Sequence, residues 1–192
     1  MNDKERNDII ISWVTLSAAF AVIMSRVSIF SLGRGFEELP INFLVSLIAV
    51  GGGFVLHELA HKYVAQRYGF WAEFRYWQTG LILGFLMAFT PLLFLAPGAV
   101  YISSGVYGMS RRQNAYISLA GATTNVALAF LFTFLEGFVG GRIASFAVQI
   151  NLLLAMFNML PIPPLDGSKV FAWSPKNWGI IFVGLIILNN IL

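Results

Sequence analysis

The two histidines of this chain, His57 and His61, lie four residues apart in the pentad His57-Glu58-Leu59-Ala60-His61. On a helix this spacing places both imidazoles on one face, about one turn apart, where they can bind the same metal ion. The glutamate beside the first histidine can activate a water molecule at that metal. Because the pentad lies in an apolar stretch long enough to cross a membrane, it predicts zinc-dependent hydrolysis within lipid.

A catalytic zinc site needs a third protein ligand, and the chain has no further histidine and no cysteine. The remaining candidates are carboxylates in or beside the predicted membrane segments: Glu73, Glu136 and Asp166. Asp166 follows a proline-rich turn that breaks a helix at the membrane and can direct the carboxylate inward. Glu136 falls on the opposite side of the membrane in the topology argued below. We therefore expect one Zn²⁺ ion per chain, held by His57, His61 and Asp166.

The composition predicts an integral membrane protein. Of the 192 residues, 58% are hydrophobic and 11% are charged, whereas soluble domains carry roughly a quarter charged residues. The net charge of +3 comes from cations spread through short loops, which are better explained as topology signals than as a nucleic-acid surface. We expect a single domain, residues 1–192, embedded in the lipid bilayer of the cell membrane, with no nucleic-acid partner.

We expect an all-α polytopic fold with about five to six transmembrane helices. The apolar segments lie at about 9–25, 41–65, 115–135, 143–160 and 178–192, with a sixth and ambiguous one at 81–102. Charged and aromatic side chains alternate along residues 72–77, a period-two pattern typical of a strand. Residues 96–101 can pair with it in a small membrane-associated β-hairpin or sheet, on which Glu73 and Arg75 form a solvated face.

Residues 81–102 decide the topology, because their length suggests a crossing while two glycines and two prolines interrupt them. A complete crossing would put Arg111, Arg112, Lys169 and Lys176 outside the cell, against the positive-inside tendency. We therefore expect a re-entrant segment that returns to its own side. With a cytoplasmic N-terminus, the metal site then lies toward the cytoplasmic half of the membrane.

Three motifs, in this order, resemble the site-2 protease family of intramembrane zinc metalloproteases. They are the pentad, a Gly-x-x-x-Asn motif at Gly121 to Asn125, and the run from Asn158 to Gly167 that contains Leu165-Asp166-Gly167. The resemblance covers about residues 52–168. Two positions depart from the family: Ala122 stands where many members have proline, and Ser168 where many have glycine. Neither position is a predicted ligand.

The resemblance implies a fold of membrane helices around a buried zinc ion, with Glu58 as the catalytic residue. It also implies that Asn125 and Asn158 position the substrate or its reacting carbonyl group. Family members cut single membrane helices of other proteins, so the implied partner is a transmembrane-helix protein substrate. An intact helix hides its peptide bonds, and we expect strand addition at residues 72–77 or 96–101 to hold the substrate extended.

Two other functions fit parts of the pattern. Prenyl-protein endopeptidases share the pentad and take a glutamate from a later helix as third ligand, but Glu136 lacks their surrounding sequence. A zinc transporter, or another non-proteolytic zinc-binding membrane protein, would need ligands on several spans and a path across the membrane. The predicted ligands of this chain gather on one side instead.

Overall fold

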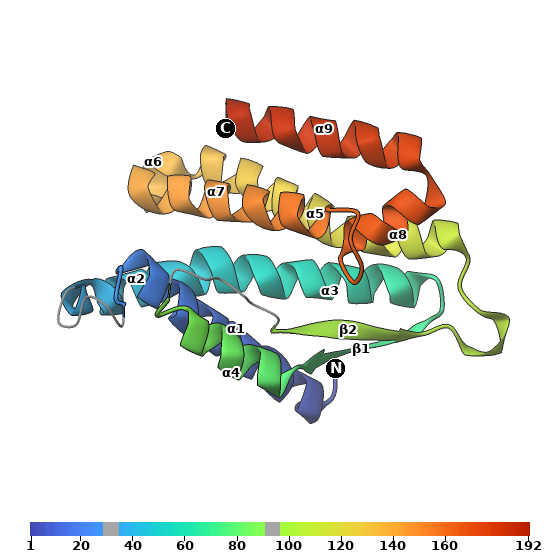
Figure 1. Ribbon diagram of the computed structural model, residues 1–192, viewed down its shortest axis with the longest axis horizontal. Coiled ribbons are helices and arrows are strands. Elements are labelled where there is room, and N and C mark those ends of the chain that lie inside the picture. Colours follow the sequence, from blue (N-terminus) through green and yellow to red (C-terminus); the bar gives the residue numbers. More distant parts are fainter. Residues whose placement is uncertain (29–34, 91–96) are drawn as a thin grey trace. The chain divides into compact units, whose positions relative to one another are not determined.

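The computed structural model describes residues 1–28, 35–90 and 97–192. Within them the chain is mostly helical, with one small two-stranded sheet (Figure 1). It forms two compact units: one comprises Met1–Val55 and Glu73–Tyr101, and the other Leu56–Ala72 and Ile102–Leu192. The prediction of a predominantly helical chain with a small two-stranded sheet is confirmed.

The first unit contains α1 (Asp3–Met24), whose N-terminus is capped by the side chain of Asn2. This helix packs against α2 (Leu39–Ser46), which follows the short η1 (Phe36–Glu38), and against η2 (Leu47–Gly51). Trp13 holds α1 against η2, because its Nε1 donates to the carbonyl oxygen of Leu47 at 2.8 Å. A Cβ atom at Gly51 would collide with the same indole ring, so the close packing requires a glycine there.

The predicted pair of strands forms a two-stranded sheet of β1 (Trp71–Tyr76) and β2 (Gly98–Ser103). Ala96, predicted to begin the second strand, lies outside the described residues. Between the strands, α4 (Gln78–Met87) has 10 residues and is about 15 Å long. That is about half of the hydrocarbon core of a bilayer, so α4 alone does not cross. The predicted re-entrant segment continues through residues 91–96, which lie outside the described residues.

Buried polar side chains attach α1 to β1. Glu5 is buried, and its Oε1 accepts a hydrogen bond from the backbone N–H of Phe74 at 3.0 Å. Arg75 forms ion pairs with Glu73 at 2.5 Å and with Asp8 at 3.4 Å. Glu73 is only 6% exposed. The expectation of a solvated strand face is therefore wrong at Glu73, because the N-terminal end of α1 covers it.

The second unit contains the remainder of α3 (Gly52–Arg67), which begins in the first unit, and the C-terminal helices. These elements are η3 (Gly105–Tyr107), α5 (Arg111–Phe134), α6 (Glu136–Val139), α7 (Gly141–Asn158), α8 (Asp166–Trp173) and α9 (Pro175–Ile191). Ser110 and Gln113 form a capping box that starts α5. The helix α5 packs against α7 and α8, and α9 packs against α7 and α8 (Figure 1).

Within the described residues, three helices are long and apolar enough to span a membrane: Asp3–Met24, Phe36–Arg67 and Arg111–Phe134. They correspond to the segments predicted at 9–25, 41–65 and 115–135. The segments predicted at 143–160 and 178–192 form α7, with 18 residues, and α9, with 17 residues. The larger number of about five to six spans stays a prediction.

Candidate metal centre

The second unit brings His57, His61 and Asp166 together. The two imidazoles lie on one face of α3, with ring centroids 4.6 Å apart and planes at 86°. Asp166 is the first residue of α8, and its Oδ2 lies 3.4 Å from His57 Nε2 and 3.0 Å from His61 Nε2. One possible ligand atom from each residue lies within 4.8 Å of the other two. Within the described parts of the chain, this is the one such cluster of His, Asp and Glu side chains.

The partners of the other imidazole nitrogens show that this cluster suits a metal ion. Nδ1 of His57 lies 2.5 Å from Oδ1 of Asn125, and Nδ1 of His61 lies 2.7 Å from the backbone carbonyl oxygen of Ile117. Carbonyl oxygens only accept hydrogen bonds, so each Nδ1 must be the donor. In a neutral imidazole this leaves the lone pair on Nε2, the atom that faces Asp166. Metal-binding histidines are oriented in this way.

A chain of buried amides orients Asn125 in turn. Nδ2 of Asn125 donates to Oδ1 of Asn151 at 2.9 Å, and Nδ2 of Asn151 donates to the carbonyl oxygen of Ala147 at 2.8 Å. Both asparagines have 0% exposed surface. Because the amide nitrogen of Asn125 contacts Asn151, its oxygen is the atom that faces His57. The geometry therefore places Asn125 against one of the candidate ligands.

Gly121 provides the space for the two imidazoles. A Cβ atom at this position would lie 2.6 Å from His61 Nε2 and would collide with the ring of His57. Asn125 follows one helical turn later on the same face of α5. The two fixed residues of the Gly-x-x-x-Asn motif therefore have different roles. Gly121 leaves space for the two imidazoles, and Asn125 forms a hydrogen bond with one of them, His57.

The turn before α8 directs Asp166 toward the histidines. Gly167 packs so closely against the end of α7 that a Cβ atom there would collide with the carbonyl groups of Met159 and Leu160. Lys169 donates to Oδ1 of Asp166 at 3.2 Å and to the carbonyl oxygen of Pro164 at 2.6 Å. The lysine therefore occupies one carboxylate oxygen and leaves Oδ2 to face the histidines.

The Asp166 side chain is 13% exposed. Burial acts to raise the pKa of Asp166, but the imidazoles of His57 and His61 beside Oδ2, together with the charge of Lys169, hold that pKa well below its usual range. The carboxyl group is therefore ionised at neutral pH, which is the form that binds a metal.

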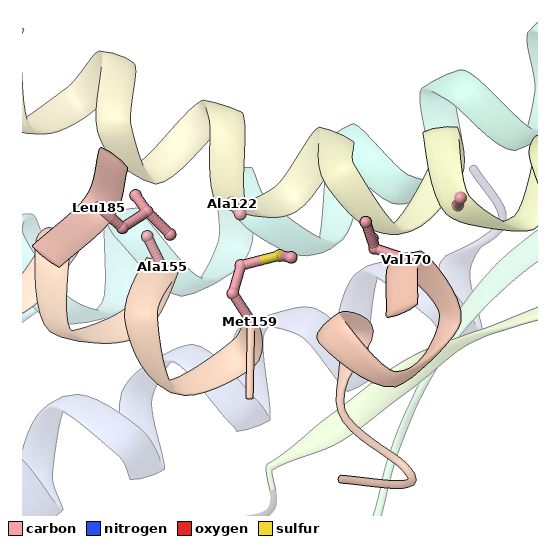
Figure 2. Close-up of a cluster of buried hydrophobic side chains, with 6 residues drawn as sticks. Ala122, Ala155, Met159, Val170 and Leu185 are labelled. Atoms are coloured by element: carbon pink, nitrogen blue, oxygen red, sulfur yellow. The ribbon is translucent and has the colours of Figure 1, made fainter. Parts of the chain in front are cut away.

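A hydrophobic cluster holds α8 in place behind Asp166. Val170 of α8 is fully buried and packs with Ala122 of α5, Ala155 of α7, Leu185 of α9 and Met159, the residue that follows α7 (Figure 2). Trp178 adds a hydrogen bond from its Nε1 to the carbonyl oxygen of Met159 at 2.8 Å. This packing fixes the helix that carries the third candidate ligand relative to α5 and α7.

The other predicted site residues lie elsewhere in the same unit. Glu58 follows His57 on α3 and is half-buried. Nδ2 of Asn158 donates to the carbonyl oxygen of Leu154 in its own helix at 3.0 Å. Glu136 is exposed at the start of α6, beyond the end of α5, and does not belong to the cluster.

Sequence reasoning missed Asn151, Lys169 and the carbonyl group of Ile117. The first had a usable signal, because a polar side chain within an apolar helix is costly unless it has a partner. Lys169 was interpreted only as a topology signal. Its contact with Asp166 depends on the i,i+3 spacing at the start of α8, which needs the helix boundary to be known. The contact of His61 with the carbonyl oxygen of Ile117 could not be predicted, because every residue has a backbone carbonyl group and the side chain at position 117 does not identify this one.

The chain is 51% identical over 150 residues to "Putative zinc metalloprotease MJ0611" of Methanocaldococcus jannaschii, covering 75% of this chain and 78% of the relative. It is 31% identical over 139 residues to "Putative zinc metalloprotease YwhC" of Bacillus subtilis, covering 61% and 63%. It is 28% identical over 192 residues to "Putative zinc metalloprotease Rip2" of Mycolicibacterium smegmatis, covering 80% and 71%. No protein-family model and no solved structure matches the chain.

Proposed function

The chain belongs to the zinc metalloprotease family of these relatives, the site-2 proteases that its motifs resemble, and we propose that it is an intramembrane zinc endopeptidase. Its substrate is a transmembrane-helix protein, and the bond that it hydrolyses lies within or near that helix. The observation that carries this proposal is the convergence of His57, His61 and Asp166 beside Glu58, with the pentad on a helix of membrane-spanning length.

The depth of the site supports cleavage within the membrane. The candidate span Phe36–Arg67 ends at Arg67, and His61 and His57 lie six and ten residues before that end. These separations correspond to about 9 Å and 15 Å along the helix. The hydrocarbon core is about 30 Å thick, so in a helix that enters the core at Arg67 both ligands lie below the membrane surface, with His57 near the middle of the core.

The side chains at the site have separate tasks in this proposal. A zinc ion held by His57, His61 and Asp166 supplies Lewis acidity, which acidifies water and polarises a peptide carbonyl group. Glu58 accepts a proton as the water oxygen attacks the carbonyl carbon, and it delivers that proton to the amide nitrogen when the C–N bond breaks. The products are a new carboxyl group and a new amine. Asn125 acts through His57 as a positioning residue.

Substrate binding is assigned to two features. Asn158 keeps the expected role of positioning the substrate, with its amide near the end of α7 that leads to Asp166. Strand addition is restricted to one of the two expected edges. The backbone N–H of Trp77 donates to the carbonyl oxygen of Pro97, just before the second strand. Backbone N–H groups an odd number of residues apart point to opposite edges of a strand, so the N–H of Phe74 points away from β2. That N–H donates to Glu5 instead. The outer edge of β1 is thus capped, which favours β2 as the docking strand.

We assign the protein to the cell membrane as a multi-pass protein with a cytoplasmic N-terminus and a site in the cytoplasmic half. Arg67 ends one candidate span and Arg111 begins another. Cations at both positions favour placing these helix ends in the cytoplasm. The alternative prenyl-protein endopeptidase would need Glu136 as a ligand, and its position outside the cluster argues against that function.

The test is to map the cut. Purified, zinc-loaded protein reconstituted in bilayers is mixed with single-span reporter proteins, and the products are identified by mass spectrometry. We expect cleavage inside or at the border of the apolar segment, and no cleavage of the soluble flanks presented alone. Cleavage only in soluble, unfolded segments would contradict intramembrane action and leave the metalloprotease chemistry in place.

A further inference from the structure

A groove whose lining includes none of the three candidate metal ligands lies between α3 and α5. It has a volume of about 500 Å³, and its walls are formed by Ala60, Tyr63, Val64, Tyr116, Leu119, Ala120, Thr123 and Thr124. Both helices belong to candidate membrane spans. The wall is mostly apolar, with hydroxyl groups only at its tyrosines and threonines. Such a surface suits a hydrocarbon chain better than water.

Each of the two tyrosines that line the groove contacts an arginine four residues away on the same helix. The guanidinium of Arg67 donates to the hydroxyl of Tyr63 and lies 4.9 Å above its ring centroid. The guanidinium of Arg112 donates to the hydroxyl of Tyr116 at 3.3 Å and lies 5.4 Å above that ring. Stacking and hydrogen bonding together keep both cations beside the groove.

The two arginines lie at the same end of the groove. His57 contacts Asn125 and His61 contacts Ile117, so α3 and α5 run antiparallel. Arg67 lies six residues beyond His61, and Arg112 lies five residues before Ile117. At 1.5 Å per residue, Arg67 lies about 9 Å beyond His61 and Arg112 about 7.5 Å beyond Ile117, both toward the same end of the helix pair. Since α3 and α5 are both candidate spans, that end is a membrane surface.

Neither guanidinium forms an ion pair with a carboxylate in the described part of the chain, and both arginines are exposed. Two cations at a membrane surface, above an apolar groove between spanning helices, match the charge and shape of one kind of molecule. We propose that this groove binds an anionic glycerophospholipid. Its phosphate contacts Arg67 and Arg112, and one hydrocarbon chain lies along Val64, Leu119 and Ala120.

The site adds a function to the protein that does not depend on proteolysis. Because α3 carries His57 and His61 and α5 carries Gly121 and Asn125, a lipid wedged between the outer faces of these helices supports the two elements that hold the metal. We therefore expect anionic lipid to raise the thermal stability of the protein.

The experiment is a lipid titration of the full chain followed by native mass spectrometry. The probes are phosphatidylglycerol and phosphatidylcholine, which share a phosphate and differ in net charge. We expect the wild type to retain phosphatidylglycerol in preference, and the double variant Arg67→Gln/Arg112→Gln to bind it roughly 30-fold more weakly. Arg142→Gln removes an exposed arginine of α7 outside the groove and should keep the wild-type preference.

Equal retention of both lipids by the wild type would overturn the proposal, and so would an unchanged preference in the double variant. Tight binding of inorganic phosphate that displaces phosphatidylglycerol would overturn the lipid assignment. Zinc content verifies folding. If the double variant loses its zinc, the Ala120→Trp variant tests the site instead, because its indole ring fills the groove while both arginines remain. Zinc-loaded Ala120→Trp should lose the bound lipid, and retention of the lipid would contradict the site.

Discussion

Oδ1 of Asn125 lies 2.5 Å from Nδ1 of His57, and both side chains are buried. This contact connects a metal-ligand candidate on α3 to α5, and through Asn151 to α7. Partners of this kind set the tautomer and orientation of a ligating imidazole, and their loss typically lowers metal affinity about 10- to 100-fold.

Replacing Asn125 or Asn151 by leucine should therefore weaken zinc binding without removing a ligand. We expect about a 10- to 100-fold loss for Asn125→Leu and a smaller loss for Asn151→Leu, which leaves the His57 contact in place but frees its partner to rotate. Chelator competition measures the affinity, and the absorption spectrum of the cobalt-substituted protein reports distortion of the ligand geometry.

Asn158→Leu is the matched control, because Asn158 has the same side chain but donates to its own helix. It should keep the zinc affinity and the cobalt spectrum of the wild type. An unchanged spectrum in Asn125→Leu would show that Asn125 does not orient the ligand.

Gly121→Ala should disrupt the metal site, since the added methyl group would overlap both imidazoles. The outcome expected is loss of bound zinc, measured by elemental analysis after gel filtration. Gly184→Ala is the control, because a Cβ atom at that position meets nothing within 4 Å. Full zinc occupancy in Gly121→Ala would mean that the histidines do not approach α5 as described.

Asp166→Ala and Glu136→Ala separate the two enzyme classes that share the pentad. Asp166 has Oδ2 directed at both histidines, whereas Glu136 is exposed and outside the cluster. We expect Asp166→Ala to lose zinc and Glu136→Ala to retain it. The reverse result would favour the prenyl-protein endopeptidase alternative.

The sequence predicted the parts of the site that depend on side-chain chemistry. Two histidines at helical spacing and the lack of further histidine or cysteine restricted the third ligand to a carboxylate, and the proline-rich turn singled out Asp166. The β-hairpin followed from the period-two pattern of residues 72–77. Each of these inferences uses local spacing or donor chemistry, which a sequence displays directly.

The supporting contacts depended on tertiary structure. Asn125 and Asn151 are 26 residues apart, and their hydrogen bond exists only because α5 and α7 pack in one register. Glu73 was expected on a solvated face because its strand alternates, but α1 covers that face. Alternation shows that a strand has two faces and does not show which of them another element will cover.

The most direct test of the account is to compare wild type with Glu58→Gln, using purified protein with zinc quantified and a panel of single-span reporters. The substitution keeps the size of the side chain but removes the group that carries the proton, and it touches none of the three candidate ligands. We expect both proteins to hold one zinc ion per chain and only the wild type to cut. Cleavage by Glu58→Gln at the wild-type rate, or a folded wild type that binds no zinc, would contradict it.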